Sequence, residues 1–306
     1  MKVVVAGGTG YIGSHLVPGL ADAGHEAIVL TRRRPAEVGG LPGGAEAVQW
    51  DPSTPDRPLV QALTGADAVV NLAGTNIGTA PWTPGRRRSV LESRLQATKT
   101  LVDALADVEP SRRPGALVNA SGIDYYGDRG EEAVAEPADP GSSFLATVCR
   151  LWEAEARKAE SAGVRVATLR TGLVLSRGAL SLRLLALPFR LFVGGPLGSG
   201  RQWVSWIHVD DVVGLYRLAI EDAAVAGAMN MVSPNPVRNE ELAAALARVL
   251  GRPARLRTPE PLLRLALGGM ADLVLHGRRA VPEVATARGY RYRYPTLDAA
   301  LADALG

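Results

Sequence analysis

Residues 2–13 read Lys-Val-Val-Val-Ala-Gly-Gly-Thr-Gly-Tyr-Ile-Gly and lie close to the start of the chain. The Val-rich run before the first glycine predicts a buried strand, because β-branched side chains favour extended backbone. Glycines recur at positions 7, 10 and 13, and the helical apolar spacing that follows is closed by Gly24. The sequence therefore predicts a strand, a glycine-rich turn and a helix in direct succession.

Each of the three glycines has a physical role in such a unit. Gly7 permits a tight turn, Gly10 lets the backbone approach a pyrophosphate, and Gly13 lets the helix pack closely on the strand. Free N–H groups at the helix N-terminus favour a phosphate beside Tyr11 and Ile12. We predict a dinucleotide-binding site here. The alternative is a plain strand-turn-helix unit with incidental glycines.

The composition indicates a compact globular protein, because 47% of the 306 residues are hydrophobic. The single cysteine, Cys149, cannot form an internal disulfide, which favours a reducing, cytoplasmic location. No signal peptide or membrane span is predicted, since the longest apolar stretch, residues 179–193, contains two arginines and a proline.

Charge gives little indication of a macromolecular partner. The formal net charge is +3, and 31 acidic residues are interleaved with the basic ones. A solvated surface explains this distribution, so nucleic acid is not expected as a partner. We expect a small-molecule substrate and no metal site, with a homodimer as a candidate assembly.

Alternating strand and helix patterns continue beyond the first unit. Strands are predicted at residues 26–31, 45–50, 66–72, 116–120 and 164–170, and helices at residues 84–107 and 142–162. This alternation predicts an α/β protein with a doubly wound, parallel Rossmann sheet. Ligands bind such sheets at the carboxyl ends of the strands.

The pattern changes after residue 170. A glycine-rich loop follows at residues 194–200, and helices are predicted at residues 239–250, 261–275 and 297–305. We predict a dinucleotide-binding domain of residues 1–176, to which residues 205–233 return. Residues 177–204 and 234–306 are expected to form a smaller, mainly helical lobe that closes over the cofactor.

The end of the second predicted strand indicates which dinucleotide is bound. An NAD site would place Asp or Glu there, but this chain has Thr31 followed by Arg32 and Arg33. A guanidinium matches a phosphate through its planar fork. We therefore predict NADP(H) as the cofactor, with three solvated arginines, residues 32–34, as the alternative.

The glycine turn, residues 71–74 (Asn-Leu-Ala-Gly) and residues 121–127 (Ser-Gly-Ile-Asp-Tyr-Tyr-Gly) together resemble an extended short-chain dehydrogenase/reductase. Residues 149–153 (Cys-Arg-Leu-Trp-Glu) and 206–211 (Trp-Ile-His-Val-Asp-Asp) narrow the match. They are similar to the atypical "epimerase family" of NADP-binding proteins, which has a small C-terminal domain of its own. The resemblance covers essentially the whole chain.

The resemblance implies a set of cofactor contacts. Thr31 and Arg32 would hold the adenosine phosphate, and Val174 would lie near the nicotinamide carboxamide. The remaining positions that it implies beside the cofactor are Leu72, Ala73, Gly74, Arg94 and Ser121.

The acid/base pair of the parent superfamily is missing from this sequence. That pair is Tyr-x-x-x-Lys, in which the lysine lowers the pKa of the tyrosine. Neither Lys99 nor Lys158 has a tyrosine four residues before it. On the predicted helix the two possible registers give Phe144 with Val148, or Val148 with Trp152, and all three side chains are apolar.

Three other residues are candidates for chemistry. Tyr125 and Asp124 follow the fifth predicted strand, where a tyrosine or a desolvated carboxyl can transfer a proton. For Tyr125 the alternative is an aromatic wall, and for Asp124 it is a solvated carboxylate. Ser121 stands one residue before the usual serine position, which is Gly122, so strand geometry would turn its side chain to the other face.

Two further residues have structural interpretations. His208 lies in an apolar segment and is expected to be a hydrogen-bonded structural histidine. Glu153 is expected to pair with Arg150 on its own helix.

We predict an oxidoreductase or a redox-neutral epimerase-like enzyme that acts on a small, largely apolar carbonyl or hydroxyl compound. A nucleotide sugar is not expected, because Val204 replaces the diphosphate-binding arginine of nucleotide-sugar enzymes. The alternative is a catalytically impaired protein that binds NADPH and senses the NADPH/NADP ratio. The residues predicted to line the substrate pocket are aromatic: Trp82, Tyr125, Phe189, Trp203 and Trp206.

Overall fold

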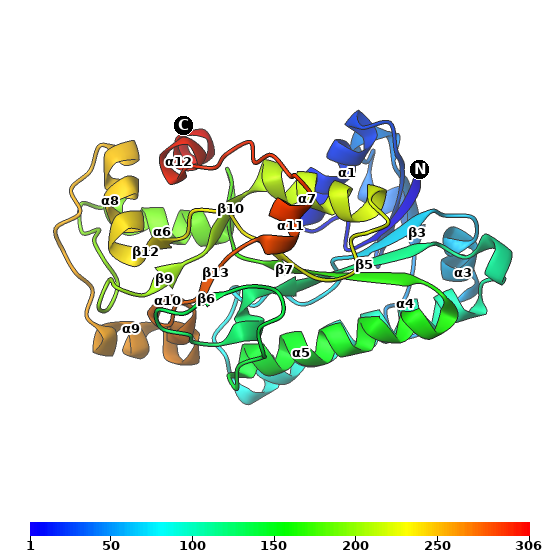
Figure 1. The fold of residues 1–306 in the computed structure, drawn as a ribbon, viewed down its shortest axis with the longest axis horizontal. Helices are drawn as coiled ribbons and strands as arrows, with labels where there is room; N and C mark the ends of the chain where they lie inside the picture. Colours follow the sequence, from blue (N-terminus) through cyan, green and yellow to red (C-terminus); the bar gives the residue numbers. More distant parts are fainter.

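Seven parallel strands form the central sheet of the computed structural model, which describes residues 1–306 (Figure 1). Their order is β11-β7-β5-β4-β1-β2-β3. The chain reverses its direction of growth between β1 and β4, so the predicted doubly wound Rossmann sheet is confirmed. The strands are β1 Lys2–Ala6, β2 Glu26–Thr31, β3 Glu46–Gln49, β4 Ala68–Asn71, β5 Ala116–Gly122, β7 Arg165–Thr171 and β11 Gly227–Met231.

Helices cover both faces of this sheet (Figure 1). In β1, Val3 and Val5 enter one hydrophobic core while Val4 and Ala6 enter the other, because successive strand side chains alternate. The first core is closed by α1 (Tyr11–Asp22) and α7 (Val209–Glu221). The second is closed by α3 (Arg57–Leu63), α4 (Pro84–Asp107) and α5 (Phe144–Arg157).

A smaller, mainly helical region lies at one end of the sheet, on the left of Figure 1. Its core is built by α6 (Leu180–Arg190), α8 (Asn239–Leu250) and α12 (Leu297–Leu305). The outermost elements are α9 (Glu260–Leu267), η5 (Gly268–Ala271) and α10 (Asp272–Leu275). The predicted helix at residues 261–275 is therefore interrupted, because Gly268 has a φ of +54° that ends α9.

Three pairs of short strands lie outside the main sheet. β8 (Leu173–Leu175) pairs with β10 (Trp206–His208), and β9 (Trp203–Val204) pairs with β12 (Val237–Arg238). β6 (Ala133–Val134) pairs with β13 (Arg279–Ala280). The last pair joins the loop after β5 to the C-terminal part of the chain.

The C-terminal part does not lie wholly in the smaller region. Helix α11 (Glu283–Ala287) packs on the main sheet, because Ala285 is buried in the same core as α7, with Tyr290 and Tyr292 against it. This differs from the predicted lobe of residues 234–306. The remaining short elements are α2 Pro35–Val38, η1 Pro42–Gly44, η2 Pro110–Arg112, η3 Ile123–Tyr126 and η4 Lys158–Ala162.

None of the helices combines the length and the apolar character that crossing a membrane requires.

Candidate functional site

The glycine turn after β1 is packed too tightly for side chains. Gly7 has a φ of +78°, and a Cβ there would lie 2.9 Å from the carbonyl carbon of Leu72. A Cβ on Gly13 would lie 2.5 Å from the Cα of Gly8. Gly10 donates its N–H to the Gly7 carbonyl at 2.9 Å. The turn therefore requires glycine so that its backbone segments can approach one another. Its outer edge is left without side chains, and we call it the bare edge.

The start of α1 presents backbone donors at this bare edge. The first intrahelical bond runs from the Ser14 N–H to the Gly10 carbonyl at 2.8 Å, so the earlier N–H groups of Tyr11 and Ile12 have no partner within the helix. The Ile12 side chain packs against the sheet core, and the Tyr11 hydroxyl donates to the carbonyl of Arg177 at 3.2 Å. Both residues therefore present backbone N–H groups to an anion.

The end of β2 combines one buried hydroxyl with exposed cations. The Thr31 side chain is buried, and its Oγ1 accepts a hydrogen bond from the Arg33 N–H at 3.2 Å. The guanidinium groups of Arg32 and Arg33 are exposed and have no hydrogen-bond or ion-pair partner. The hydroxyl orders the backbone, and the two cations stay available to a phosphate.

The loop after β4 is held by Asn71, whose Oδ1 accepts the Ala73 N–H at 3.1 Å. Leu72 and Ala73 are half-buried beside the glycine turn. Gly74 leaves room for the Arg94 side chain, since a Cβ on Gly74 would lie 3.0 Å from it. These residues lie together, as the resemblance implied.

Arg94 is a desolvated cation without a carboxylate partner. Its Nη1 donates to the carbonyls of Thr75 at 2.9 Å and Val90 at 3.0 Å, and its guanidinium lies 4.9 Å from the Trp152 ring centroid. Burial lowers the pKa of Arg94. The guanidinium is thus fixed between the β4 loop and α5 with its charge uncompensated.

At the carboxyl ends of β5 and β7 lies a buried ion pair that the sequence did not predict. Arg170 donates Nε to Glu153 Oε1 at 2.9 Å and Nη2 to Glu153 Oε2 at 2.8 Å. Ser121 Oγ donates to the same Glu153 Oε1 at 2.6 Å. The predicted partner of Glu153, Arg150, is wrong, because Glu153 points inward from α5 and both partners lie on strands.

Tyr126 extends this network away from the ion pair. Its hydroxyl accepts Arg170 Nη1 at 2.9 Å and donates to Asn230 Oδ1 at 2.7 Å. Burial raises the pKa of the Tyr126 hydroxyl. Tyr126 is therefore part of the structural network, and its hydroxyl proton is already donated to Asn230.

Tyr125 is different, because its hydroxyl has no hydrogen-bond partner. Its ring lies on the Arg170 guanidinium, 3.4 Å from centroid to Cζ, and the side chain is half-buried. A cation on an aromatic face fixes the ring plane. Of the three candidate catalytic residues, Ser121 donates to a carboxylate and Asp124 Oδ1 accepts from Arg278 at 2.6 Å, so only Tyr125 has a side chain without any hydrogen-bond or ion-pair partner.

Helix α5 is the helix on which the resemblance places the Tyr and Lys of the parent superfamily. In this chain it carries a buried indole and a buried thiol there. Trp152 is buried and donates Nε1 to Thr98 Oγ1 at 2.8 Å. Cys149 is buried below Gly122, and burial, with Asp124 and Glu153 nearby, raises the pKa of its thiol to about 12. Neither side chain can replace the missing pair.

Val174 lies on β8 opposite Ile207 of β10, and its half-buried side chain packs against the main core. The short pair β8–β10 thus lies directly after the end of β7, where the resemblance placed Val174 near the nicotinamide carboxamide.

The five predicted pocket aromatics are not brought together. Phe189 and Trp206 are 3% and 0% exposed and belong to the core of the smaller region, so they have no surface left for a substrate. Trp203 is half-buried between the guanidiniums of Arg238 and Arg279. Packing among α6, α8 and α12 buries Phe189 and Trp206, which were predicted to line the substrate pocket.

Trp82 remains at the rim of the site. Its ring meets Phe144, the first residue of α5, edge-on at 5.5 Å between centroids, and α5 packs against η3, which carries Tyr125. Gly269 of the C-terminal region approaches the same indole. An aromatic rim therefore borders the loop that carries Tyr125.

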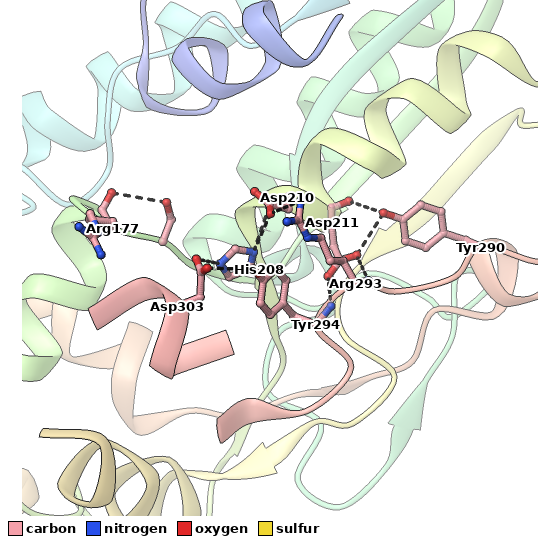
Figure 2. A network of polar contacts seen from close by, with 9 residues as sticks. Arg177, His208, Asp210, Asp211, Tyr290, Arg293, Tyr294 and Asp303 are labelled. Atoms are coloured by element: carbon pink, nitrogen blue, oxygen red, sulfur yellow. Dashed lines mark hydrogen bonds and ion pairs between the residues drawn. The ribbon is translucent and has the colours of Figure 1, made fainter. Parts of the chain in front are cut away.

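His208 anchors the C-terminal segment and does not enter the site (Figure 2). It is 1% exposed, its Nδ1 accepts the Asp210 N–H at 3.2 Å, and its Nε2 bonds Asp303 at 3.1 Å. Its ring lies on Tyr294 at 3.8 Å between centroids. Burial lowers the pKa of His208. The prediction of a hydrogen-bonded structural histidine agrees with these contacts.

Asp211 completes this anchor from the first turn of α7 (Figure 2). Its carboxylate accepts the backbone N–H groups of Arg293 at 2.7 Å and Tyr294 at 3.0 Å, and the Tyr290 hydroxyl at 3.2 Å. The chain between α11 and α12 is therefore fastened to the main sheet.

Comparisons with known proteins agree with this geometry. A family model described as the NAD dependent epimerase/dehydratase family matches residues 3–231, and a domain of unknown function, DUF1731, matches residues 258–304. The chloroplastic epimerase family protein SDR39U1 homolog of Arabidopsis thaliana is 38% identical over 310 residues, covering 98% of this chain and 86% of that protein. The epimerase family protein YfhF of Bacillus subtilis is 36% identical over 98% of this chain and 97% of its own length.

A solved structure extends the similarity to three dimensions. The human epimerase family protein SDR39U1, crystallised with NADPH, is 34% identical, covers 99% of each chain and superimposes with a TM-score of 0.87.

Proposed function

This chain belongs to the NAD-dependent epimerase/dehydratase family, as its sequence motifs predicted, and we propose that it is an NADP(H)-dependent oxidoreductase or redox-neutral epimerase-like enzyme. Its substrate would be a small, largely apolar carbonyl or hydroxyl compound. The observation that carries the proposal is the glycine turn, whose bare edge and free N–H groups lie beside two unpaired cations at the end of β2.

The residues present fit a dinucleotide. The pyrophosphate would meet the N–H groups of Tyr11 and Ile12, where the helix dipole favours an anion. The 2′-phosphate would meet Thr31 and Arg32, and a charge-assisted hydrogen bond there contributes about 1.5–3 kcal/mol. The related human protein crystallised with NADPH supports this choice over NAD.

Arg94 would neutralise part of the cofactor's negative charge. A desolvated guanidinium with only carbonyl partners is costly unless an anion approaches it. Its place between the β4 loop and α5 suits a diphosphate or ribose that passes along the carboxyl ends of the strands. We therefore keep Arg94 in the proposed cofactor site.

Bound NADPH would supply a hydride at its nicotinamide. Tyr125 is the proposed proton donor to the developing alkoxide, because its hydroxyl is unengaged and Arg170 fixes its ring. Ser121 and Asp124 are not proposed as donors, since the first already donates to Glu153 and the second is ion-paired. Trp82 and Phe144 would form the apolar wall of the substrate site.

A second function is favoured by one observation. Glu153 and Arg170 form a closed network beside the α5 positions of the missing Tyr and Lys. Such a network suits a protein that binds NADPH without turnover. Such a sensor would bind NADPH and NADP with clearly different affinity or oligomeric state and convert no carbonyl compound. Equal affinity for both forms, together with turnover, would remove it.

The test uses NADPH deuterated at the transferring position of C4 and a set of apolar aldehydes and ketones that includes nitrobenzaldehyde. We expect deuterium in the alcohol product. A redox-neutral reaction would instead exchange label between deuterated NADPH and the corresponding alcohol, at constant nicotinamide absorbance, when NADP+ is also supplied to accept the hydride of the alcohol. No transfer or exchange with any compound, despite tight NADPH binding, would contradict the enzymatic proposal.

A further inference from the structure

The C-terminal region is fastened to the loop that carries Tyr125. β13 pairs in parallel with β6, and the Val281 N–H continues the pairing to the Val134 carbonyl at 3.0 Å. The Arg129 N–H reaches the Gly277 carbonyl at 3.3 Å. Backbone bonds thus join residues 277–281 to residues 129–134, directly after η3.

Arg278 connects the two ends of η3. Its Nη1 donates to Asp124 Oδ1 at 2.6 Å, and its Nε donates to the Gly127 carbonyl at 3.0 Å. The Arg278 and Asp124 side chains are 12% and 20% exposed. Because Tyr125 lies between these two contacts, one guanidinium fixes the turn from which the Tyr125 ring extends onto Arg170.

The same turn covers Cys149. A Cβ on Gly122 would lie 3.6 Å from the Cys149 Sγ and 3.5 Å from Asp124 Oδ2, so the bare glycine and the Asp124 carboxylate lie over the thiol. Cys149 is 6% exposed and is the only cysteine of the chain. Loosening of the turn would therefore be reported by this one thiol.

We propose that Arg278 is a positioning residue, through which the C-terminal region matched by the domain of unknown function holds the Tyr125 turn in its working conformation. The role of Tyr125 rests on the proposed function, but the clamp itself does not. A planar guanidinium provides two donors at fixed angles, which a lysine ammonium cannot reproduce.

Alkylation of Cys149 by iodoacetamide, without cofactor or substrate, tests the clamp. We expect Arg278→Ala to raise the rate about tenfold or more, because opening of the turn becomes easier when charged hydrogen bonds are lost. Asp124→Asn should raise it in the same direction, and the double variant should add little to Arg278→Ala. Arg279→Ala, one residue along β13, is the matched control and should leave the rate unchanged.

Conservative replacement separates positioning from general stability. Arg278→Lys should leave the thermal midpoint near that of the wild type while Cys149 stays more reactive than in the wild type, since the two-point contact is lost. With nitrobenzaldehyde as substrate, Arg278→Lys should lower kcat more than it raises KM. If Arg278→Ala does not fold, Arg278→Lys and Asp124→Asn provide the same measurement.

The outcomes separate the two proposals. Wild-type alkylation rates in Arg278→Lys and Asp124→Asn would overturn the clamp whatever the enzyme catalyses. A similar rise in Arg279→Ala would also overturn it, because the effect would then belong to β13 as a whole. Increased alkylation in an enzyme that transfers no deuterium would retain the clamp and remove only the proposed function.

Discussion

The two ends of the candidate site are built in opposite ways. At the cofactor end, the glycine turn and the end of β2 leave polar groups without partners: backbone N–H groups of α1 and the guanidiniums of Arg32 and Arg33. At the reaction end, Glu153, Arg170 and Ser121 bind one another in a buried network. Donors that lack a partner within the protein indicate a ligand site, whereas donors that are hydrogen-bonded within the protein indicate a structural role.

This difference indicates which side chains remain free to transfer a proton. Buried charges are retained when each is paired and hydrogen-bonded, and such pairs leave little freedom for proton transfer. Among the predicted catalytic residues, only Tyr125 has a side chain without any hydrogen-bond or ion-pair partner, although its ring lies on Arg170 of the network. The predictions below test each end separately.

The largest expected effect comes from breaking the buried pair. Glu153→Gln keeps an acceptor for Ser121 but leaves the Arg170 charge uncompensated, at 4% side-chain exposure. We expect the free energy of unfolding to fall by about 3–5 kcal/mol, measured by denaturant titration.

The matched control for this pair is Glu155→Gln, two residues along α5. Glu155 pairs with Lys158, whose side chain is 62% exposed, so its loss should cost about 0.5 kcal/mol or less. Similar costs for the two variants would show that the Glu153–Arg170 pair is not the organising contact of the reaction end.

The next effect concerns the cofactor end. Gly13→Ala would place a Cβ 2.5 Å from the Gly8 backbone, so α1 must shift away from the turn. We expect NADPH affinity to fall about a hundredfold, measured by nicotinamide fluorescence, because the donors of the α1 N-terminus move. Gly85→Ala, where a Cβ meets nothing within 4 Å, should bind as the wild type does. Retained affinity in Gly13→Ala would argue against the turn as the phosphate site.

The sequence predicted the strand, glycine turn and helix at the proposed cofactor end, because their determinants are local. Gly13, whose Cβ would meet Gly8, and the end of β2 at Thr31 are set by neighbours within a few residues. Helix 84–107 was predicted with its observed bounds for the same reason, since Pro84 begins it and Thr83 caps it. Local determinants are visible in a single sequence.

The reaction end could not be predicted in this way. Glu153 lies 17 residues from Arg170, and Arg278 lies 154 residues from Asp124, so no periodicity reports either pair. Phe189 and Trp206 were predicted to line the substrate pocket, but long-range packing buried them. Strand β11 was missed because its sequence, Gly-Ala-Met-Asn-Met, has no β-branched residue.

Cofactor choice should depend on Arg32. We expect Arg32→Ala to weaken NADPH about tenfold to hundredfold and NADH little, since only NADPH carries the 2′-phosphate. Parallel titrations of the two cofactors provide the measurement. Arg112→Ala is the control, because Arg112 precedes β5 and lies at the amino end of that strand. It should change the affinity for neither cofactor. Equal losses for NADPH and NADH in Arg32→Ala would exclude a 2′-phosphate contact.

The smallest expected effect is the pH dependence of the His208 anchor. Because burial lowers the pKa of His208 below its ordinary value of 6.5, the unfolded chain binds a proton first as pH falls. Its stabilising contribution is therefore complete above that value and is lost as pH falls toward the lowered pKa. The free energy of unfolding of wild type and His208→Gln should differ less at lower pH. A difference that grows on acidification would mean that the charged form binds Asp303 in the folded protein.

Deuteride transfer by Tyr125→Phe tests the central claim most directly. The variant keeps the ring on Arg170 and removes only the unengaged hydroxyl. We expect transfer from deuterated NADPH to nitrobenzaldehyde to fall about a hundredfold, with NADPH affinity unchanged, as loss of a general acid requires. Transfer at the wild-type rate would contradict the assignment of Tyr125 as the proton donor of this site.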